Sequence, residues 1–248
     1  MTDLAETRTP EGVAGMFDGL AKGYDRINDL MTGGMHRLWK RRLVERLALR
    51  PGDRVLDLCS GTGDIALLEA RVVGPDGSVT GLDFSVRMLD VARSRPGASG
   101  MAAVIWQEGD ATRLPFEDAS FAAVSVGFGL RNVQDLDQAL REAVRVLRPG
   151  GHFASLDLGK PRLLPVRWAT GLHARYLAPV LAWLAGGPWS AYAYLPRSNR
   201  FFPDQRELAR RFRTAGLSEV TVQDFGLGAV ALVSGRKPAD APFSAESC

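Results

Sequence analysis

Between residues 54 and 66 the sequence reads Arg54-Val55-Leu56-Asp57-Leu58-Cys59-Ser60-Gly61-Thr62-Gly63-Asp64-Ile65-Ala66. Its first half is a short apolar run, typical of a buried parallel strand, and from Ile65 the apolar residues recur at helical spacing. The glycines between them lack a Cβ, so backbone N–H groups and the positive end of a helix can approach a ligand closely. The pattern predicts a strand, a glycine turn and a helix, which form either a ligand-binding loop or a plain connection.

A second motif follows about 20 residues after the turn. Gly81-Leu82-Asp83-Phe84-Ser85 ends another apolar run, where a doubly wound sheet places an acidic residue against ribose hydroxyls. A nicotinamide dinucleotide would use the same carboxylate, but its fingerprint needs a further glycine where this chain has Ala66. With Asp57 before the loop, the pattern instead resembles the S-adenosylmethionine (SAM) methyltransferases, in which this acid helps to hold the ammonium end of the cofactor. The cofactor residues that the resemblance implies in these two motifs are Asp57, Gly61, Thr62, Gly63, Asp83 and Phe84.

Two later predicted strands add further expected cofactor residues at their ends. A third strand is predicted from Ala102 to Trp106, and in methyltransferases the acid or amide that follows receives the adenine amino group while the next residue supplies a backbone N–H. Asp110 and Ala111 fit that role. A fourth strand is predicted to run into Gly127, the last expected cofactor residue. The Asn/Asp-Pro-Pro-aromatic sequence that grips exocyclic amines in nucleobase methyltransferases does not follow it.

Three further segments carry a resemblance to a family. They are Tyr24-Asp25-x-x-Asn28 with Thr32-x-x-x-His36-Arg37-x-Trp39-Lys40, then Phe128-Gly129-Leu130-Arg131-Asn132, and then the stretch from Arg145 to Pro161. In this order they resemble the ubiquinone/menaquinone biosynthesis C-methyltransferases, which methylate a ring carbon of polyprenyl benzoquinols or demethylmenaquinol. The chain departs from that pattern at several positions: Ile27 replaces Met, Thr32 replaces Ser, Asp157 and Gly159 replace Glu and Ser, and Val233 replaces His.

The resemblance implies a SAM-dependent C-methyltransferase of quinone biosynthesis, similar to the demethylmenaquinone methyltransferases. Its acceptor would be a lipid-soluble quinol, either demethylmenaquinol or a polyprenyl benzoquinol. The polar candidates around the reacting ring carbon are Tyr24, His36, Arg131 and Asn132, together with Asp25. Arg131 cannot be a neutral base at pH 7, because the pKa of a guanidinium exceeds about 12. A methyltransferase acting on a soluble small molecule and a non-catalytic partner subunit remain open as alternatives.

The resemblance also implies an architecture. We expect an α/β protein with the seven-stranded, Rossmann-like sheet of class I SAM-dependent methyltransferases, forming a single domain from residue 13 to 238. A helical N-terminal cap is expected at 13–50 and a helical insertion at 162–200, between a disordered segment at 1–12 and a flexible tail at 239–248. The insertion is rich in aromatic residues, which serve either as core or as a channel for an isoprenoid tail: Trp168, Tyr176, Trp183, Trp189, Tyr192 and Tyr194.

Composition narrows the classes of function. The chain has 248 residues, 46% of them hydrophobic, and a net charge of only +3, which is too small to indicate a nucleic-acid partner. Two cysteines, Cys59 and Cys248, and the absence of a leader or an apolar run of about 18 residues favour a cytoplasmic location. The cluster Lys40-Arg41-Arg42 is either a solvated helix face or a contact with anionic lipid, which would place the protein peripherally at the inner face of the membrane. Scattered histidines predict no metal site, and the oligomeric state stays open.

Overall fold

The computed structural model describes residues 15, 18, 23–177, 179–181, 199 and 201–239. The segment predicted to be disordered, 1–12, lies outside these residues, and so does the predicted tail after residue 239. Four aromatic residues of the expected insertion also lie outside them, namely Trp183, Trp189, Tyr192 and Tyr194.

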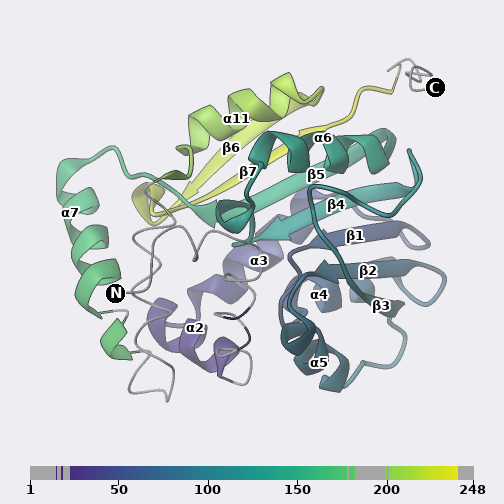
Figure 1. Ribbon diagram of the computed structural model, residues 1–248, viewed down its shortest axis with the longest axis horizontal. Coiled ribbons are helices and arrows are strands. Elements are labelled where there is room, and N and C mark those ends of the chain that lie inside the picture. The colour runs from purple at the N-terminus through teal and green to yellow at the C-terminus, as the bar shows by residue number, and fades with distance from the viewer. Residues whose placement is uncertain are drawn as a thin grey trace.

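The core of the fold is a seven-stranded sheet with the strand order β3-β2-β1-β4-β5-β7-β6 (Figure 1). The strands are β1 (Arg54–Leu58), β2 (Ser78–Asp83), β3 (Ala103–Glu108), β4 (Phe121–Gly127), β5 (Leu147–Leu158), β6 (Ser218–Phe225) and β7 (Val230–Arg236). The first five strands are parallel to one another, whereas β7 is antiparallel to both of its neighbours, β5 and β6. The predicted seven-stranded α/β sheet is confirmed.

Helices cover both faces of the sheet. On one face, α3 (Met35–Arg46) and α4 (Asp64–Val73) pack through residues such as Leu43 and Ala70 on the side chains of Val55 and Val79. On the other face, α6 (Leu136–Val146) packs beside β5, and α11 (Gln205–Thr214) packs beside β6 and β7, in a cluster of buried side chains that includes Leu56. Successive side chains of a strand point to opposite faces of the sheet, so Val55 packs in one helical layer and Leu56 in the other. α5 (Val86–Ser94) packs beside β2 and β3.

Local sequence explains where these helices begin. The Ser85 hydroxyl accepts a hydrogen bond from the Met88 N–H and starts α5. Asp135 and Asp204 cap α6 and α11 in the same way. α4 begins after Gly63, whose φ of 85° lies in the left-handed region that suits glycine.

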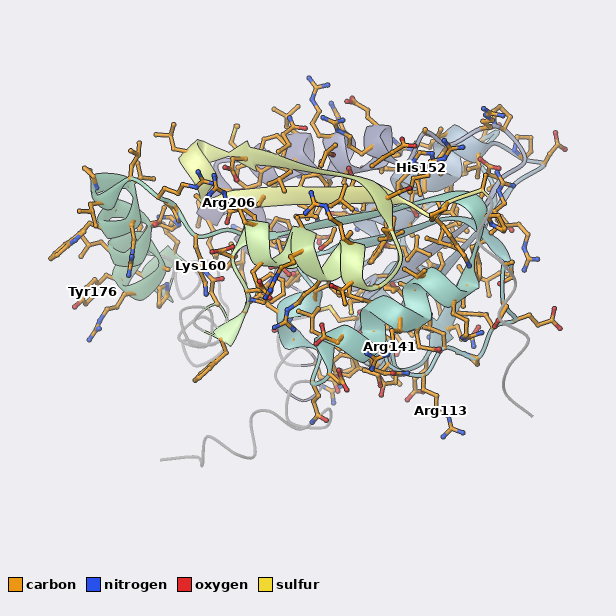
Figure 2. The ribbon with its side chains drawn as sticks, turned by 90° about the horizontal axis from the view of Figure 1, so that it is seen from above. Arg113, Arg141, His152, Lys160, Tyr176 and Arg206 are labelled. Carbon is orange, nitrogen blue, oxygen red and sulfur yellow. The ribbon has the colours of Figure 1, made fainter. Side chains whose placement is uncertain are left out.

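Before the sheet, α2 (Tyr24–Thr32) and α3 meet at Gly33 and Gly34, both with positive φ. After β5, α7 (Leu164–Leu172) continues into a π-helical turn, η3 (His173–Leu177). Neither has a buried residue, and Figure 2 shows α7 at one end of the molecule, apart from the helices on the sheet. In the described part of the chain, no helix combines the length and hydropathy needed to cross a membrane. Two 3₁₀ turns complete the fold, η2 (Leu130–Asn132) and η4 (Gly226–Gly228).

Candidate active site

The glycine turn after β1 is fastened to the end of β2. One carboxylate oxygen of Asp83 accepts a hydrogen bond from the Gly61 N–H at 2.8 Å, and the other accepts from the Ser85 N–H at 2.9 Å. Burial raises the pKa of Asp83 above its usual value, although these N–H groups oppose the shift. The register Leu58–Leu82 sets the two strand ends side by side, which brings the turn and the acid together.

Two adjoining hollows open at this edge of the sheet, and we call them together the edge cleft. Their volumes are about 140 Å³ and about 40 Å³, and Cys59, Asp83, Phe84 and Asn132 line both. Of the predicted cofactor residues, six lie in the edge cleft: Gly61, Asp83, Phe84, Asp110, Ala111 and Gly127. The structure therefore brings together residues from four strand ends that are far apart in the sequence.

Three predicted cofactor residues are placed differently, since none of them lines the edge cleft. Asp57 is almost fully buried beneath the turn, where its carboxylate accepts hydrogen bonds from the Ser125 hydroxyl at 2.7 Å and from the Ala66 N–H at 3.1 Å. Burial raises the pKa of Asp57 to about 7. Thr62 and Gly63 also face away from the edge cleft, as their neighbours show.

The Thr62 hydroxyl donates to Asp25 of α2 at 2.6 Å, which ties the glycine turn to the helical cap. A Cβ on Gly63 would lie 2.4 Å from the indole of Trp106, so the turn packs directly on β3. Both residues support the shape of the turn.

Two residues other than glycine adopt left-handed backbone conformations at the edge of the sheet. Cys59 has a φ of 53° after β1, and Phe128 has a φ of 58° after β4. The Phe128 N–H donates to the carbonyl of Leu156, and a Cβ on the adjacent Gly129 would lie 2.4 Å from the Cβ of Cys59. Such strained residues persist only where the surroundings hold them, and they concentrate at functional sites.

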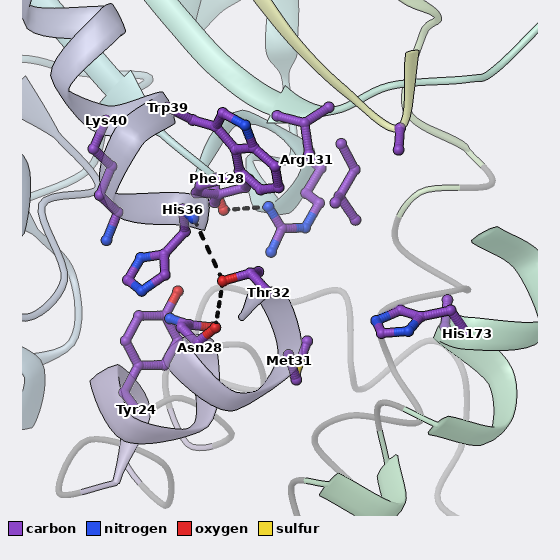
Figure 3. Close-up of a pocket in the computed structure, with 14 residues that line it drawn as sticks. Tyr24, Asn28, Met31, Thr32, His36, Trp39, Lys40, Phe128, Arg131 and His173 are labelled. Atoms are coloured by element: carbon purple, nitrogen blue, oxygen red, sulfur yellow. Dashed lines mark hydrogen bonds between the residues drawn. The ribbon is translucent and has the colours of Figure 1, made fainter. Parts of the chain in front are cut away.

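A larger cavity of about 330 Å³ lies between α2, α3 and the ends of β4, β5 and β7, and we call it the cap cavity (Figure 3). Its lining residues are Tyr24, Asn28, Met31, Thr32, His36, Trp39, Lys40, Phe128, Arg131, Leu158, His173, Ala174, Ala229 and Val230. Tyr24 and Phe128 line the edge cleft as well, so they stand where the two spaces meet. An apolar pocket with a few polar groups beside a second cleft suits a reaction between two bound molecules.

Arg131 enters the cap cavity from η2 and is held by a buried acid. Its guanidinium lies 2.7 Å from the carboxylate of Asp157 at the end of β5, and it also donates to the carbonyl of Phe128. The Asp157 carboxylate accepts from the N–H groups of Arg131 and Leu158 as well. Asp157 thus still reaches a partner, although its side chain is shorter than the Glu of the family pattern.

His36 enters the cap cavity from the first turn of α3, and its ring is almost completely buried. Its Nε2 lies 2.8 Å from the carboxylate of Asp29 on α2. Arg37 binds the same carboxylate with two nitrogens. The hydrogen bond from Arg37, and after it the one from His36, holds the pKa of Asp29 below its usual value. Asp29 is therefore a carboxylate at neutral pH.

The other predicted catalytic residues divide between the two spaces. Tyr24 lines both, Arg131 and His36 line the cap cavity, and Asn132 lines only the edge cleft. Asp25 lines neither of them and binds Thr62 and Arg95 instead. Asp29 and His173 were not singled out from the sequence, and Asp157 was noted there only as a departure from the family pattern. Among the residues that the structure describes, no group of three His, Cys, Asp or Glu could bind a metal ion.

Known proteins resemble this chain in sequence over most of its length. The sequence model of the ubiE/COQ5 methyltransferase family matches residues 1–237. A demethylmenaquinone methyltransferase of Desulfitobacterium hafniense (strain Y51) is 40% identical over 223 residues, which are 90% of this chain and 88% of that protein. The demethylmenaquinone methyltransferase of Staphylococcus aureus (strain JH9) is 38% identical over 230 residues, covering 93% of this chain and 95% of that protein.

Solved structures of more distant proteins share the fold. A possible histamine N-methyltransferase of Thermotoga maritima superimposes with a TM-score of 0.61 at 21% identity, covering 90% of this chain and 99% of the other. The [4+2]-cyclase SpnF gives a TM-score of 0.64 at 21% identity, covering 93% and 96%. Because these two proteins are named for different reactions, the likeness establishes the fold alone.

Proposed function

The chain belongs to the ubiE/COQ5 methyltransferase family, and we propose that it transfers the methyl group of SAM to a ring carbon of demethylmenaquinol, giving menaquinol. The single observation that carries this proposal is the position of the cap cavity, which meets the edge cleft at Tyr24 and Phe128. A ring in the cap cavity would thus lie next to a methyl group presented from the edge cleft.

SAM fits the chemistry of the edge cleft. Asp83 has two acceptor oxygens of which each takes one backbone N–H, which leaves lone pairs for ribose hydroxyls. Asp110 and the backbone of Ala111 lie farther along the same cleft, where an adenine amino group would find an acceptor and a ring nitrogen would find a donor. Gly61 leaves room for the amino-acid end at the boundary with the cap cavity, since no atom lies within 4 Å of a Cβ placed there, and Gly127 lines the same hollow.

The cap cavity would hold the acceptor ring among Trp39, Phe128 and Leu158, with Arg131 near a quinol oxygen. Electron density from that oxygen makes the ring carbon nucleophilic. The carbon then forms a bond to the methyl group as the bond from methyl to sulfur breaks, and S-adenosylhomocysteine leaves with the electron pair. Holding both reactants in line and excluding water is the main contribution of the protein.

The alternative acceptor is a polyprenyl benzoquinol, which the family resemblance also allows. The two relatives above are both named for demethylmenaquinone, and this favours the naphthoquinol. A benzoquinol lacks the second ring that the aromatic wall of the cavity would cover. Competition between the two acceptors at equal concentration measures the preference directly.

The test of the proposed function uses methyl-labelled SAM with demethylmenaquinone, in the presence and absence of dithionite. Only the reduced acceptor has an electron-rich ring carbon, so label should enter the ring when the reductant is present and remain on SAM when it is absent. Label on oxygen or nitrogen, or equal turnover without reductant, would contradict the proposal. If only a benzoquinol became labelled, the proposed substrate would be wrong and the proposed type of reaction would stand.

We further propose that α7 contacts the surface of the membrane that dissolves the acceptor. Its apolar side chains face water, with Trp168 72% exposed and Tyr176 of the following turn 58% exposed (Figure 2). Arg167 and Arg175 lie on the same segment, and His173 and Ala174 of that segment line the cap cavity. Aromatic and basic side chains together favour reversible binding to an anionic interface.

Sedimentation with anionic vesicles tests this contact. Binding should fall as the salt concentration rises, and Trp168→Ser should weaken it because an aromatic anchor is removed. Ile105→Ser is a matched control, since Ile105 is 56% exposed on the edge strand β3. Equal binding by both variants would mean that α7 is not the attachment surface.

A further inference from the structure

A ring nitrogen in the wall of the cap cavity has no hydrogen-bond partner among the described residues. His36 is 3% exposed, and its Nδ1 forms no hydrogen bond with any residue that the structure describes. Buried nitrogens in proteins are nearly always hydrogen-bonded, and an exception calls for an explanation. The ring lines the cap cavity, so the missing partner can be a group of the bound acceptor.

The neighbours of His36 determine which nitrogen carries the proton. Asp29 accepts from Nε2 at 2.8 Å, and as a carboxylate it has no proton to donate. Nε2 must then carry the hydrogen of the neutral ring, and Nδ1 carries the lone pair. Arg37 fixes the orientation of the Asp29 carboxylate by binding both of its oxygens. The unpartnered atom is therefore the basic nitrogen of an oriented imidazole.

The other polar side chains of the cap cavity are less suited to accept a proton. Lys40 forms an ion pair with Asp64 at 2.6 Å, and an ammonium has no lone pair. Arg131 forms an ion pair with Asp157 and stays protonated. His173 comes from the π-helical turn, on the opposite side of the cavity from His36 in Figure 3, and none of the described carboxylates orients it.

We propose that His36 is the base that removes the hydroxyl proton of the quinol, and that Asp29 is a positioning residue that sets its tautomer. This rests on the proposed function, because the base needs a hydroxyl on the acceptor. The quinol proton moves to Nδ1 and gives an imidazolium that the carboxylate of Asp29 stabilises, as in other oriented acid–histidine pairs. The quinolate carbon then attacks the methyl group and displaces S-adenosylhomocysteine.

The remaining proton steps balance the reaction. Methylation leaves a ring carbon that bears both the new methyl group and its original hydrogen, in a neutral keto form. Loss of that hydrogen to water and return of the proton from His36 to the oxygen restore the aromatic quinol. One proton reaches solvent for each methyl transferred, and the enzyme returns to its starting state.

Substitution of His36 tests the base. In His36→Gln, kcat should fall by about 10²- to 10⁴-fold, the usual contribution of general base catalysis, while the affinity for SAM stays unchanged. Raising the pH toward the range where phenols ionise, about 10, should restore the rate, because the quinolate then forms in solution. The charged and titratable groups around His36 also influence the pH profile. They are Asp29, Tyr24, Arg37, Lys40, Asp64 and Arg131.

Asp29 has a matched control in another ion pair of the cap. Asp29→Asn should lower kcat by about tenfold or more, since an amide no longer fixes the tautomer. Arg42→Gln removes the exposed ion pair with Glu45 on α3 and leaves Asp29 and His36 in place, so kcat should change by less than about fivefold. Equal losses of kcat in both variants would show that Asp29 only stabilises the packing of α2 and α3, and this would overturn its positioning role.

The failures of the two proposals can be told apart. If the wild-type protein methylates no quinol, the proposed function fails. If it methylates the quinol and His36→Gln does so at the same rate, only the base assignment fails. Nitrogen-15 NMR of the wild-type imidazoles needs no variant: a hydrogen on Nε2 and none on Nδ1 of His36 is expected, and the opposite tautomer would overturn the proposal.

Discussion

The guanidinium of Arg131 and the carboxylate of Asp157 form an ion pair with a distance of 2.7 Å, in which the side chains are 6% and 2% exposed. The pair joins η2 to the end of β5 and fixes Arg131 at the wall of the cap cavity. Two buried charges stabilise a protein only while they are together, because each has lost its water.

Asp157→Ala should therefore lower the free energy of unfolding by about 3–5 kcal/mol, since it leaves a buried guanidinium without its carboxylate. Replacing both residues in Asp157→Ala/Arg131→Met should cost clearly less than the sum of the single variants. Denaturant unfolding measures both effects. Additive losses would show that the two side chains are not coupled.

Asp83→Asn should weaken SAM binding by about tenfold to a hundredfold, because a neutral amide gives up a charge-assisted hydrogen bond of about 1.5–3 kcal/mol to the ribose. The amide keeps one acceptor for the backbone of the turn, so the variant should fold. Asp118→Asn is the control, as Asp118 binds Arg145 away from the edge cleft. Calorimetric titration that gave the wild-type affinity for a folded Asp83→Asn would remove Asp83 from the cofactor site.

Asp57 should make stability depend on pH. Its pKa is raised from 3.8 to about 7 by burial, so the folded state favours the protonated carboxyl. The stabilisation that this gives is complete below about pH 4 and is lost as the pH rises through about 7. Relative to Asp57→Asn, the wild-type protein should lose stability on the order of 4 kcal/mol across that range.

Thermal unfolding of both proteins from pH 4 to pH 8 measures this difference. Burial also raises the pKa of the neighbouring Glu69, so Glu69→Gln separates the two contributions. The exposed Asp90→Asn should follow the wild-type curve. Parallel curves for wild type and Asp57→Asn would contradict the assignment.

Gly63→Ala should damage the glycine turn far more than an alanine at another left-handed glycine. The new Cβ would meet Trp106 at 2.4 Å, whereas at Gly100, which also has a positive φ, no atom lies within 4 Å. Gly100→Ala therefore measures the backbone strain alone, about 1–2 kcal/mol. A larger loss of stability in Gly63→Ala, reduced when Trp106 is replaced by Leu, isolates the packing effect. Equal losses would mean that the indole moves aside at little cost.

Much of the architecture was predictable because the signals are local. The apolar run at β1, the glycine turn and the acid at the end of β2 specify a strand order in which Asp83 meets the turn. The same rule placed Asp110 and Gly127 at the edge cleft, since parallel strands end at one edge.

The direction of individual side chains was not predictable in this way. The Thr62 side chain is turned toward Asp25, which is 37 residues away, and Gly63 is packed under Trp106 of another strand. From the sequence alone, nothing distinguishes Asp29 from an ordinary exposed acidic residue of a helix. It meets His36 only because Gly33 and Gly34 reverse the chain between α2 and α3.

The bond from Thr62 to Asp25 has a consequence for ligand exchange. α2 contacts the glycine turn through Asp25, and through Tyr24 it lines both the edge cleft and the cap cavity. The same helix would therefore contact the cofactor and the acceptor. Any ordering of α2 by one ligand then favours the other, and thermodynamic linkage makes the effect equal in both directions. The affinity for SAM should rise in the presence of the quinol by the same factor as the affinity for the quinol rises with SAM, and titrations that gave independent affinities would mean that α2 is a rigid wall.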